Sequence, residues 1–145
     1  MVFGVERRIH VITLAVDDLE RSLAFYRELG LESSGVIGTQ YEGDDTTPSG
    51  RAVRFPLEDG LALMLYGRED LAKDANVPVA QPTPGHFSIG HLVGSKAEVD
   101  EVLRRAEAAG GTLTEEAHER AWGIYSGYFR DLDGHLWEII WNPPG

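Results

Sequence analysis

"IHVITLAVDDLERSLAFYRELG", residues 9–30, predicts a strand, a turn and a helix in succession. Residues 9–16 alternate and are rich in β-branched and aliphatic side chains, which is typical of a strand. Asp17 and Asp18 can cap the following helix, and Gly30 stands where a left-handed residue ends one. Apolar residues recur between these limits at helical spacing, at Leu19, Leu23, Tyr26 and Leu29.

The same pattern occurs a second time later in the chain. Strand-like runs follow the first helix at residues 35–41, 51–57 and 61–67. Residues 67–85, which are rich in charge and proline, predict a linker. A strand at 87–93 then precedes a helix with a capping box at Ser95 and Glu98, and further strands are predicted at 111–117, 124–130 and 135–141. We therefore predict one domain, residues 1–145, made of two β-α-β-β-β modules at about 7–66 and 86–142.

An alignment of the two halves supports the repeat. RFPLEDGLALML, residues 54–65, parallels YFRDLDGHLWEI, residues 128–139, and this match pairs Met64 with Glu138. Aligning the first strands on Val16 and Val93 pairs Val11 with Ser88. A module of this kind buries one sheet face under its helix. The predicted fold is therefore α+β, with the two free sheet faces forming an open cleft.

The composition excludes several function classes. The chain has no cysteine, so disulfides, thiolate metal sites and a cysteine nucleophile are absent. Its formal net charge is −11, which repels nucleic acid. Residues 1–20 lack an apolar signal core and no run suits a membrane span, so we expect no membrane association and a cytoplasmic location.

The two modules, and in particular HVITLAVDDLERSLAFYRELG and YFRDLDGHLWEI, resemble the vicinal oxygen chelate superfamily. This superfamily includes glyoxalase I, bleomycin-resistance proteins, extradiol dioxygenases and methylmalonyl-CoA epimerase. The resemblance covers nearly the whole chain, and its ending, WGIYSGYFRDLDGHLWEIIWNP, also resembles many bacterial members whose function is mostly unassigned. It implies a small-molecule ligand or substrate and a homodimer, with the modules paired within one chain or between chains.

The resemblance also implies where a divalent metal would be held, on the first and last strands of each module. The matching positions here are Val11, Met64, Ser88 and Glu138. Valine cannot ligate a metal, and methionine sulfur suits few of these ions. His10 and His91 each have the opposite strand parity to these positions. We therefore predict that the chain has no metal site. The alternative is a site in which Glu138, together with His10 or His91, holds Ni, Zn, Fe or Mn.

Glu138 is the candidate catalytic residue, because it is a carboxylate in the otherwise apolar last strand. An ion pair with Arg54 or Arg51 is its structural alternative. His135, after the Asp133-Gly134 turn, is expected at an exposed strand start. Late aromatic residues predict a largely apolar pocket with a few polar groups. The predicted ligand-binding residues are Val11, Thr13, Met64, Ser88, Trp122, Tyr125, Tyr128 and Glu138.

Three functions remain open at this point. The first is a glyoxalase- or bleomycin-resistance-like protein that binds a small, largely apolar or aromatic molecule in the cleft without the usual metal. The second is an enzyme of the superfamily, either a metal-dependent lyase, isomerase or dioxygenase, or a metal-free acid–base catalyst that uses Glu138 with a tyrosine. The third is a non-catalytic accessory module. The missing metal ligands favour the first.

Overall fold

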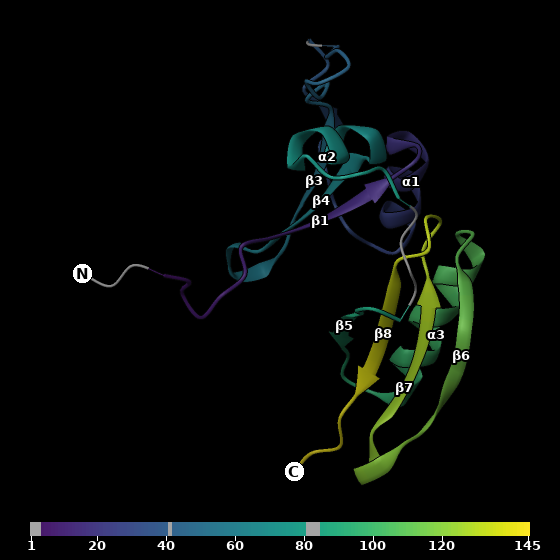
Figure 1. The fold of residues 1–145 in the computed structure, drawn as a ribbon. Coiled ribbons are helices and arrows are strands. Elements are labelled where there is room, and N and C mark those ends of the chain that lie inside the picture. The colour runs from purple at the N-terminus through teal and green to yellow at the C-terminus, as the bar shows by residue number, and fades with distance from the viewer. Residues whose placement is uncertain (1–3, 41, 81–84) are drawn as a thin grey trace. The chain divides into compact units, whose positions relative to one another are not determined.

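The computed structural model describes residues 4–40, 42–80 and 85–145, and the chain divides into two compact units (Figure 1). The first unit comprises Met1–Leu23 and Glu32–Val79, and the second comprises Ala24–Leu31 and Ala80–Gly145. Each unit contains one four-stranded mixed sheet. The first helix is continuous across the division, so it contributes residues to both units.

The first sheet has the strand order β1-β4-β3-β2. Strand β1 runs parallel to β4, and the other neighbours are antiparallel. Helix α1 and a short 3-10 turn join these strands, and helix α2 follows the last of them. The elements are β1 (Val11–Val16), α1 (Leu19–Glu28), β2 (Val36–Ile37), β3 (Ala52–Pro56), η1 (Glu58–Gly60), β4 (Ala62–Gly67) and α2 (Arg68–Ala75).

Strand alternation gives this sheet one buried face and one more accessible face. Thr13 is aligned with Met64, and Met64 with Arg54, so these three side chains share the more accessible face. The opposite face forms the core of the unit, with Leu14, Val16, Val53, Phe55, Leu63 and Leu65 almost completely buried. The predicted first strand and its parity are therefore confirmed.

Two features of the first unit differ from the sequence prediction. The predicted strand 35–41 is reduced to β2, because the chain turns at Gly38, where φ is +73° and an added Cβ would lie 2.0 Å from the Gly50 carbonyl oxygen. The segment expected as a linker contains α2, in which Arg68 is buried and binds Asp17 at 2.8 Å. Residue 41 and linker residues 81–84 lie outside the described residues.

The second sheet has the strand order β5-β8-β7-β6, with β5 parallel to β8 and the other pairs antiparallel. Helix α3 packs on β6, β7 and β8. The Ser95 side chain accepts from the Glu98 amide at its start, as the capping box predicts. The elements are β5 (Ile89–Leu92), α3 (Lys96–Ala108), β6 (Thr112–Glu119), η2 (Ala121–Gly123), β7 (Tyr125–Arg130) and β8 (Leu136–Trp141).

The second half of α1 completes the core of the second unit. Phe25 and Tyr26 are buried there, and the Tyr26 ring lies 5.8 Å from the Trp137 ring. The Tyr26 hydroxyl donates to Asp131 at 2.5 Å and accepts from the Trp137 indole at 3.1 Å. His135, expected to be exposed, is buried, because its amide donates to Asp131 in the turn before β8.

The chain thus repeats the order β-α-β-β-β twice, with α2 between the copies, and the predicted α+β class is confirmed. Among the helices of the described residues, none has the length and apolar character needed to cross a membrane.

Candidate functional site

The candidate site lies on the face of the second sheet opposite α3. On β7 and β8, Phe129 and Ile139 point into the core beneath α3 and are buried. Because side chains alternate along a strand, their neighbours point to the other face. We call this the Glu138 face. Its residues on the two central strands are Ser126, Tyr128 and Arg130 of β7 and Leu136, Glu138 and Ile140 of β8, aligned in the antiparallel register.

Glu138 is half-buried at the centre of this face and accepts a hydrogen bond from a buried hydroxyl group. The Ser126 hydroxyl donates to Oε2 of Glu138 at 2.8 Å, and Ser126 itself is fully buried. Tyr128 is directly opposite on β7, with its hydroxyl beside the Glu138 carboxylate. Both hydroxyl groups are neutral, and no cation within the described part of the second unit forms an ion pair with Glu138.

The environment of Tyr128 keeps its hydroxyl protonated. Burial raises the pKa of Tyr128, and the hydrogen bond to Glu138 and the charge of that carboxylate raise this pKa further. The Arg120 guanidinium, 5.4 Å from the ring centroid, opposes this by lowering the pKa. At neutral pH Tyr128 is therefore a hydrogen-bond donor beside a carboxylate.

Apolar side chains surround these polar groups. Leu136 and Ile140 flank Glu138 on the same face, and both are half-buried. Leu92 of β5, aligned with Ile140, is 62% exposed. A small apolar or aromatic molecule could bury this surface while it makes one polar contact at Glu138.

The structure groups three of the predicted ligand-binding residues on the first sheet. Val11 and Thr13 of β1 and Met64 of β4 share the more accessible face of that sheet. Val11 is 50% exposed and Met64 is half-buried. Thr13 is aligned with Met64 in the first sheet. Gly90 is aligned with Glu138 in the second sheet, so Thr13 and Gly90 occupy equivalent positions.

The remaining predicted residues of the second unit lie in different structural elements. Tyr125 lies on the helix side, where its hydroxyl donates to Asp100 of α3 at 2.7 Å. Ser88 precedes β5 and is exposed. Trp122 lies in the loop between β6 and β7, is 89% exposed, and has a φ of +60°. Only Tyr128 of this group contacts Glu138.

The histidines named as alternative metal ligands do not belong to either of the strand faces described above. His10 precedes β1 and is exposed. His91 is aligned with the core residue Ile139, so it lies on the opposite face of the second sheet from Glu138. Within the described ranges, no three histidine, aspartate or glutamate side chains are grouped in a way that could hold a metal ion.

Two residues of the site were not identified from the sequence. Ser126 lies two residues before Tyr128 on β7, so both side chains point to the same face of the sheet. This spacing alone could have identified Ser126 as a residue of the site. Arg120 lies in the loop after β6, where no periodic pattern applies. Its position over the Tyr128 ring follows from the turn, in which the Arg120 amide donates to the Ile124 carbonyl at 2.7 Å.

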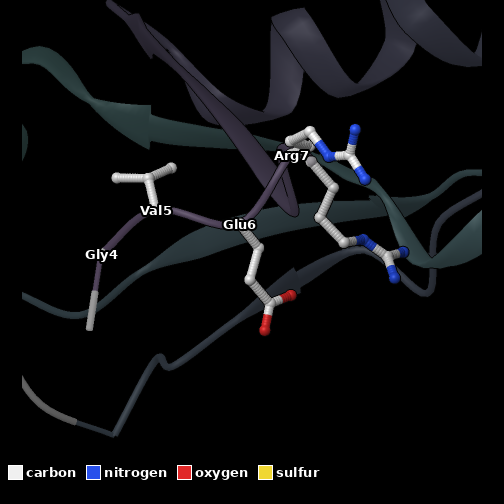
Figure 2. Close-up of a pocket in the computed structure, with 5 residues that line it drawn as sticks. Gly4, Val5, Glu6 and Arg7 are labelled. Atoms are coloured by element: carbon white, nitrogen blue, oxygen red, sulfur yellow. The ribbon is translucent and has the colours of Figure 1, made fainter. Parts of the chain in front are cut away.

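A cavity of about 880 Å³ lies elsewhere, along the extended N-terminal segment. Figure 2 shows its lining residues, and all five belong to the single continuous segment Gly4, Val5, Glu6, Arg7 and Arg8. None of the predicted site residues lines this cavity. The Glu138 face therefore remains the better candidate, because it brings together polar groups from different strands.

Comparisons with known proteins agree with this architecture. A glyoxalase-related enzyme from Fulvimarina pelagi is 30% identical, with a TM-score of 0.78 over 97% of this chain and 94% of that one. A lactoylglutathione lyase from Agrobacterium tumefaciens is 28% identical, with a TM-score of 0.65 over 94% and 95% of the two chains. The fosfomycin resistance protein FosX from Listeria monocytogenes, 23% identical, shares the fold with a TM-score of 0.65 over 99% and 96%.

No curated protein matches the chain significantly. The family profile described as the glyoxalase/bleomycin resistance protein/dioxygenase superfamily matches residues 8–139. This match covers most of the sequence and both β-α-β-β-β modules. The chain therefore belongs to the glyoxalase/bleomycin resistance protein/dioxygenase superfamily.

Proposed function

We propose that this chain binds a small, largely apolar or aromatic molecule on the Glu138 face of the second sheet. The observation that carries the proposal is the half-buried Glu138 carboxylate, which binds the Ser126 hydroxyl and lies beside Tyr128 among apolar neighbours. The Ser126 donor orients the carboxylate, while the apolar neighbours supply contact area. Val11, Thr13 and Met64, on the more accessible face of the first sheet, are also proposed as ligand contacts.

The donor set does not fit the divalent metal that the superfamily often holds. Glu138 offers one carboxylate, and its neighbours Ser126 and Tyr128 offer neutral hydroxyls. A catalytic transition-metal site typically has three imidazole, carboxylate or thiolate ligands. A structure of a FosX variant contains Mn(II) and 1S,2S-dihydroxypropylphosphonic acid, so metal binding does occur on this fold. For this chain we propose ligand binding that needs no metal.

A thermal-shift screen of EDTA-treated protein against aromatic compounds tests this proposal. A ligand raises the melting temperature because it binds only the folded state. Glu138→Gln keeps the shape of the side chain but removes its charge, so we expect it to change which compounds stabilise the protein. Glu107→Gln, an exposed position on α3, is the matched control and should behave like wild type.

The proposal fails if Glu138→Gln and wild type respond identically to every compound that binds. It also fails if binding is seen only after Mn, Ni, Fe or Zn is added. A screen in which no compound binds would instead support the accessory module as the function.

Proton transfer is a second candidate function, favoured by the contact between Glu138 and Tyr128. A carboxylate can remove a proton from carbon next to a carbonyl group, while a protonated tyrosine donates to the developing oxyanion. Delivery of a proton to the neighbouring carbon would complete an isomerisation, and exchange of the proton held by Glu138 with solvent would bring deuterium into the compound. Deuterium exchange into a bound carbonyl compound, followed by NMR, should then stop in Glu138→Gln and slow in Tyr128→Phe. Exchange at an unchanged rate in both variants would contradict this function.

A further inference from the structure

Two arginines flank Tyr128 on the Glu138 face. Arg130 follows Tyr128 by two residues on β7 and therefore points to the same face. Arg120 reaches Tyr128 from the loop after β6, with its guanidinium 5.4 Å from the ring centroid. Arg120 thus lies over the Tyr128 ring, and Arg130 shares the face of Tyr128 two residues further along β7.

The position of Arg120 is fixed by the protein itself. Its amide donates to the Ile124 carbonyl at 2.7 Å, which closes the loop. Its Nη2 donates to the Ser126 carbonyl at 3.3 Å, and its planar group packs on the Tyr128 ring. An arginine held in this way loses little conformational freedom when it binds a ligand.

Neither arginine is neutralised by a carboxylate of the described residues. The Nε atoms of Arg120 and Arg130 are buried and have no hydrogen-bond partner there. Glu115, aligned with Tyr128 on β6, lies 3.9 Å from His118 instead. Glu138 accepts from Ser126 and, within the described part of the chain, forms no ion pair with either arginine. Both arginine side chains are only half-buried, so a guanidinium without a carboxylate partner keeps its charge available to an anionic ligand.

We infer that the ligand carries an oxyanion, of which a carboxylate is the simplest case, that pairs with Arg120 and Arg130 beside Tyr128. The inference rests on the proposed function and extends it from a small apolar or aromatic molecule to an anionic one. The net charge of −11 opposes anion binding in general, so a local pair of cations is what makes an anionic ligand possible. A planar guanidinium matches a carboxylate through two parallel hydrogen bonds.

The test compares aromatic acids with their own amides. Benzoate, phenylacetate and 1-naphthoate are titrated into the full chain by calorimetry, each beside its neutral primary amide. Wild type should bind each acid about tenfold or more tightly than the amide, since a charged hydrogen-bonded pair is lost in the amide. Arg120→Gln and Arg130→Gln should each weaken binding of the acid while binding of the amide is unchanged.

Two sets of variants make the outcome specific. Arg104 is an exposed residue of α3, on the other side of the unit. Arg104→Gln removes the same charge there, and this variant should still bind acids more tightly than amides. Arg120→Lys and Arg130→Lys keep the charge but lose the planar group, so they should fall between wild type and the glutamine variants. They also replace the glutamine variants if those do not fold.

Equal binding of acids and amides by wild type would overturn this inference and leave the proposed function intact. A preference for acids that survives in Arg120→Gln and Arg130→Gln would overturn it too, because the anion would then bind elsewhere. If neither acids nor amides bind, the proposed function fails together with the inference.

Discussion

Tyr128 is the residue that connects the groups of the candidate site. Its hydroxyl contacts Glu138 and its ring contacts Arg120, so its pKa reports both neighbours. Glu138→Gln removes a negative charge that raises this pKa, so we expect the pKa of Tyr128 to fall. Arg120→Gln removes a positive charge, so the same pKa should rise. NMR titration of protein labelled with 13C at the tyrosine Cζ measures both shifts. Two shifts of the same sign would contradict this geometry.

A second tyrosine, Tyr26, stabilises the second unit from inside its core. Tyr26→Phe removes the donor to Asp131 and the acceptor of the Trp137 indole, and both of these groups stay largely buried. We expect the free energy of unfolding to fall by about 1–3 kcal/mol. Tyr125→Phe, which loses a hydrogen bond to the exposed Asp100, is the matched control and should lose less. Urea unfolding measures both, and equal losses would contradict the role of Tyr26.

The pH dependence of stability tests the same residue. Burial, followed by the charge of Asp131 and the hydrogen bond to it, raises the pKa of Tyr26 well above the usual value. The folded state therefore holds this proton more tightly than the unfolded state, and the stabilisation is fully present below about pH 10. It is lost as the pH rises above that value. The free energy of unfolding, measured by urea titration at increasing alkaline pH, should thus fall more for wild type than for Tyr26→Phe. An equal fall in both proteins would show that ionisation of Tyr26 does not affect stability.

At the residue scale, the sequence predicts the site only where strand alternation applies. Glu138 and Tyr128 were identified, and Ser126 could have been identified by the same spacing. Tyr125 was assigned to the ligand site, but it has the opposite parity and binds α3. Arg120 was missed because its position depends on a turn rather than on a period.

At the scale of elements, the close packing of β7 on α3 and β6 depends on Gly127. A Cβ added there would lie 2.6 Å from Leu103 Cδ1 and 2.8 Å from the Ala117 amide nitrogen. We expect Gly127→Ala to destabilise the protein by about 1–3 kcal/mol, because backbone cannot move away as a side-chain end can. Gly90→Ala, whose Cβ would meet only Ile140 Cδ1 at 3.5 Å, is the control and should change stability by about 0.5 kcal/mol or less. Similar melting temperatures for the two variants would contradict this packing.

The strands and the two long helices were predictable because local signals agree with the tertiary structure. The capping box of α3 and the alternation in β1 each act over a few residues. Helix α2 was missed because its eight residues carry no apolar stripe. Contacts distant in sequence hold it instead, from Arg68 to Asp17 and from Asp70 to Ser49.

At the scale of the whole molecule, α1 contributes residues to both compact units. Unfolding of either unit should therefore remove part of the helix that the other unit needs, and we expect one cooperative transition. All three tryptophans, Trp122, Trp137 and Trp141, belong to the second unit. Tryptophan fluorescence thus reports that unit alone, whereas far-ultraviolet circular dichroism reports both. Coincident urea transitions are predicted, and separate midpoints would show that the modules unfold independently.

The central claim is that the Glu138 face binds a small molecule without a metal. NMR chemical-shift mapping of EDTA-treated, 15N-labelled protein, titrated with benzoate and then with Mn(II), tests it most directly. We predict that benzoate shifts the amide signals of Ser126, Tyr128 and Glu138, and that Mn(II) is not required for these shifts. The titration is repeated with Zn(II), which is diamagnetic, in place of Mn(II). Benzoate-induced shifts confined to other residues would contradict the central claim. Shifts that benzoate causes only after Zn(II) is added would contradict it as well.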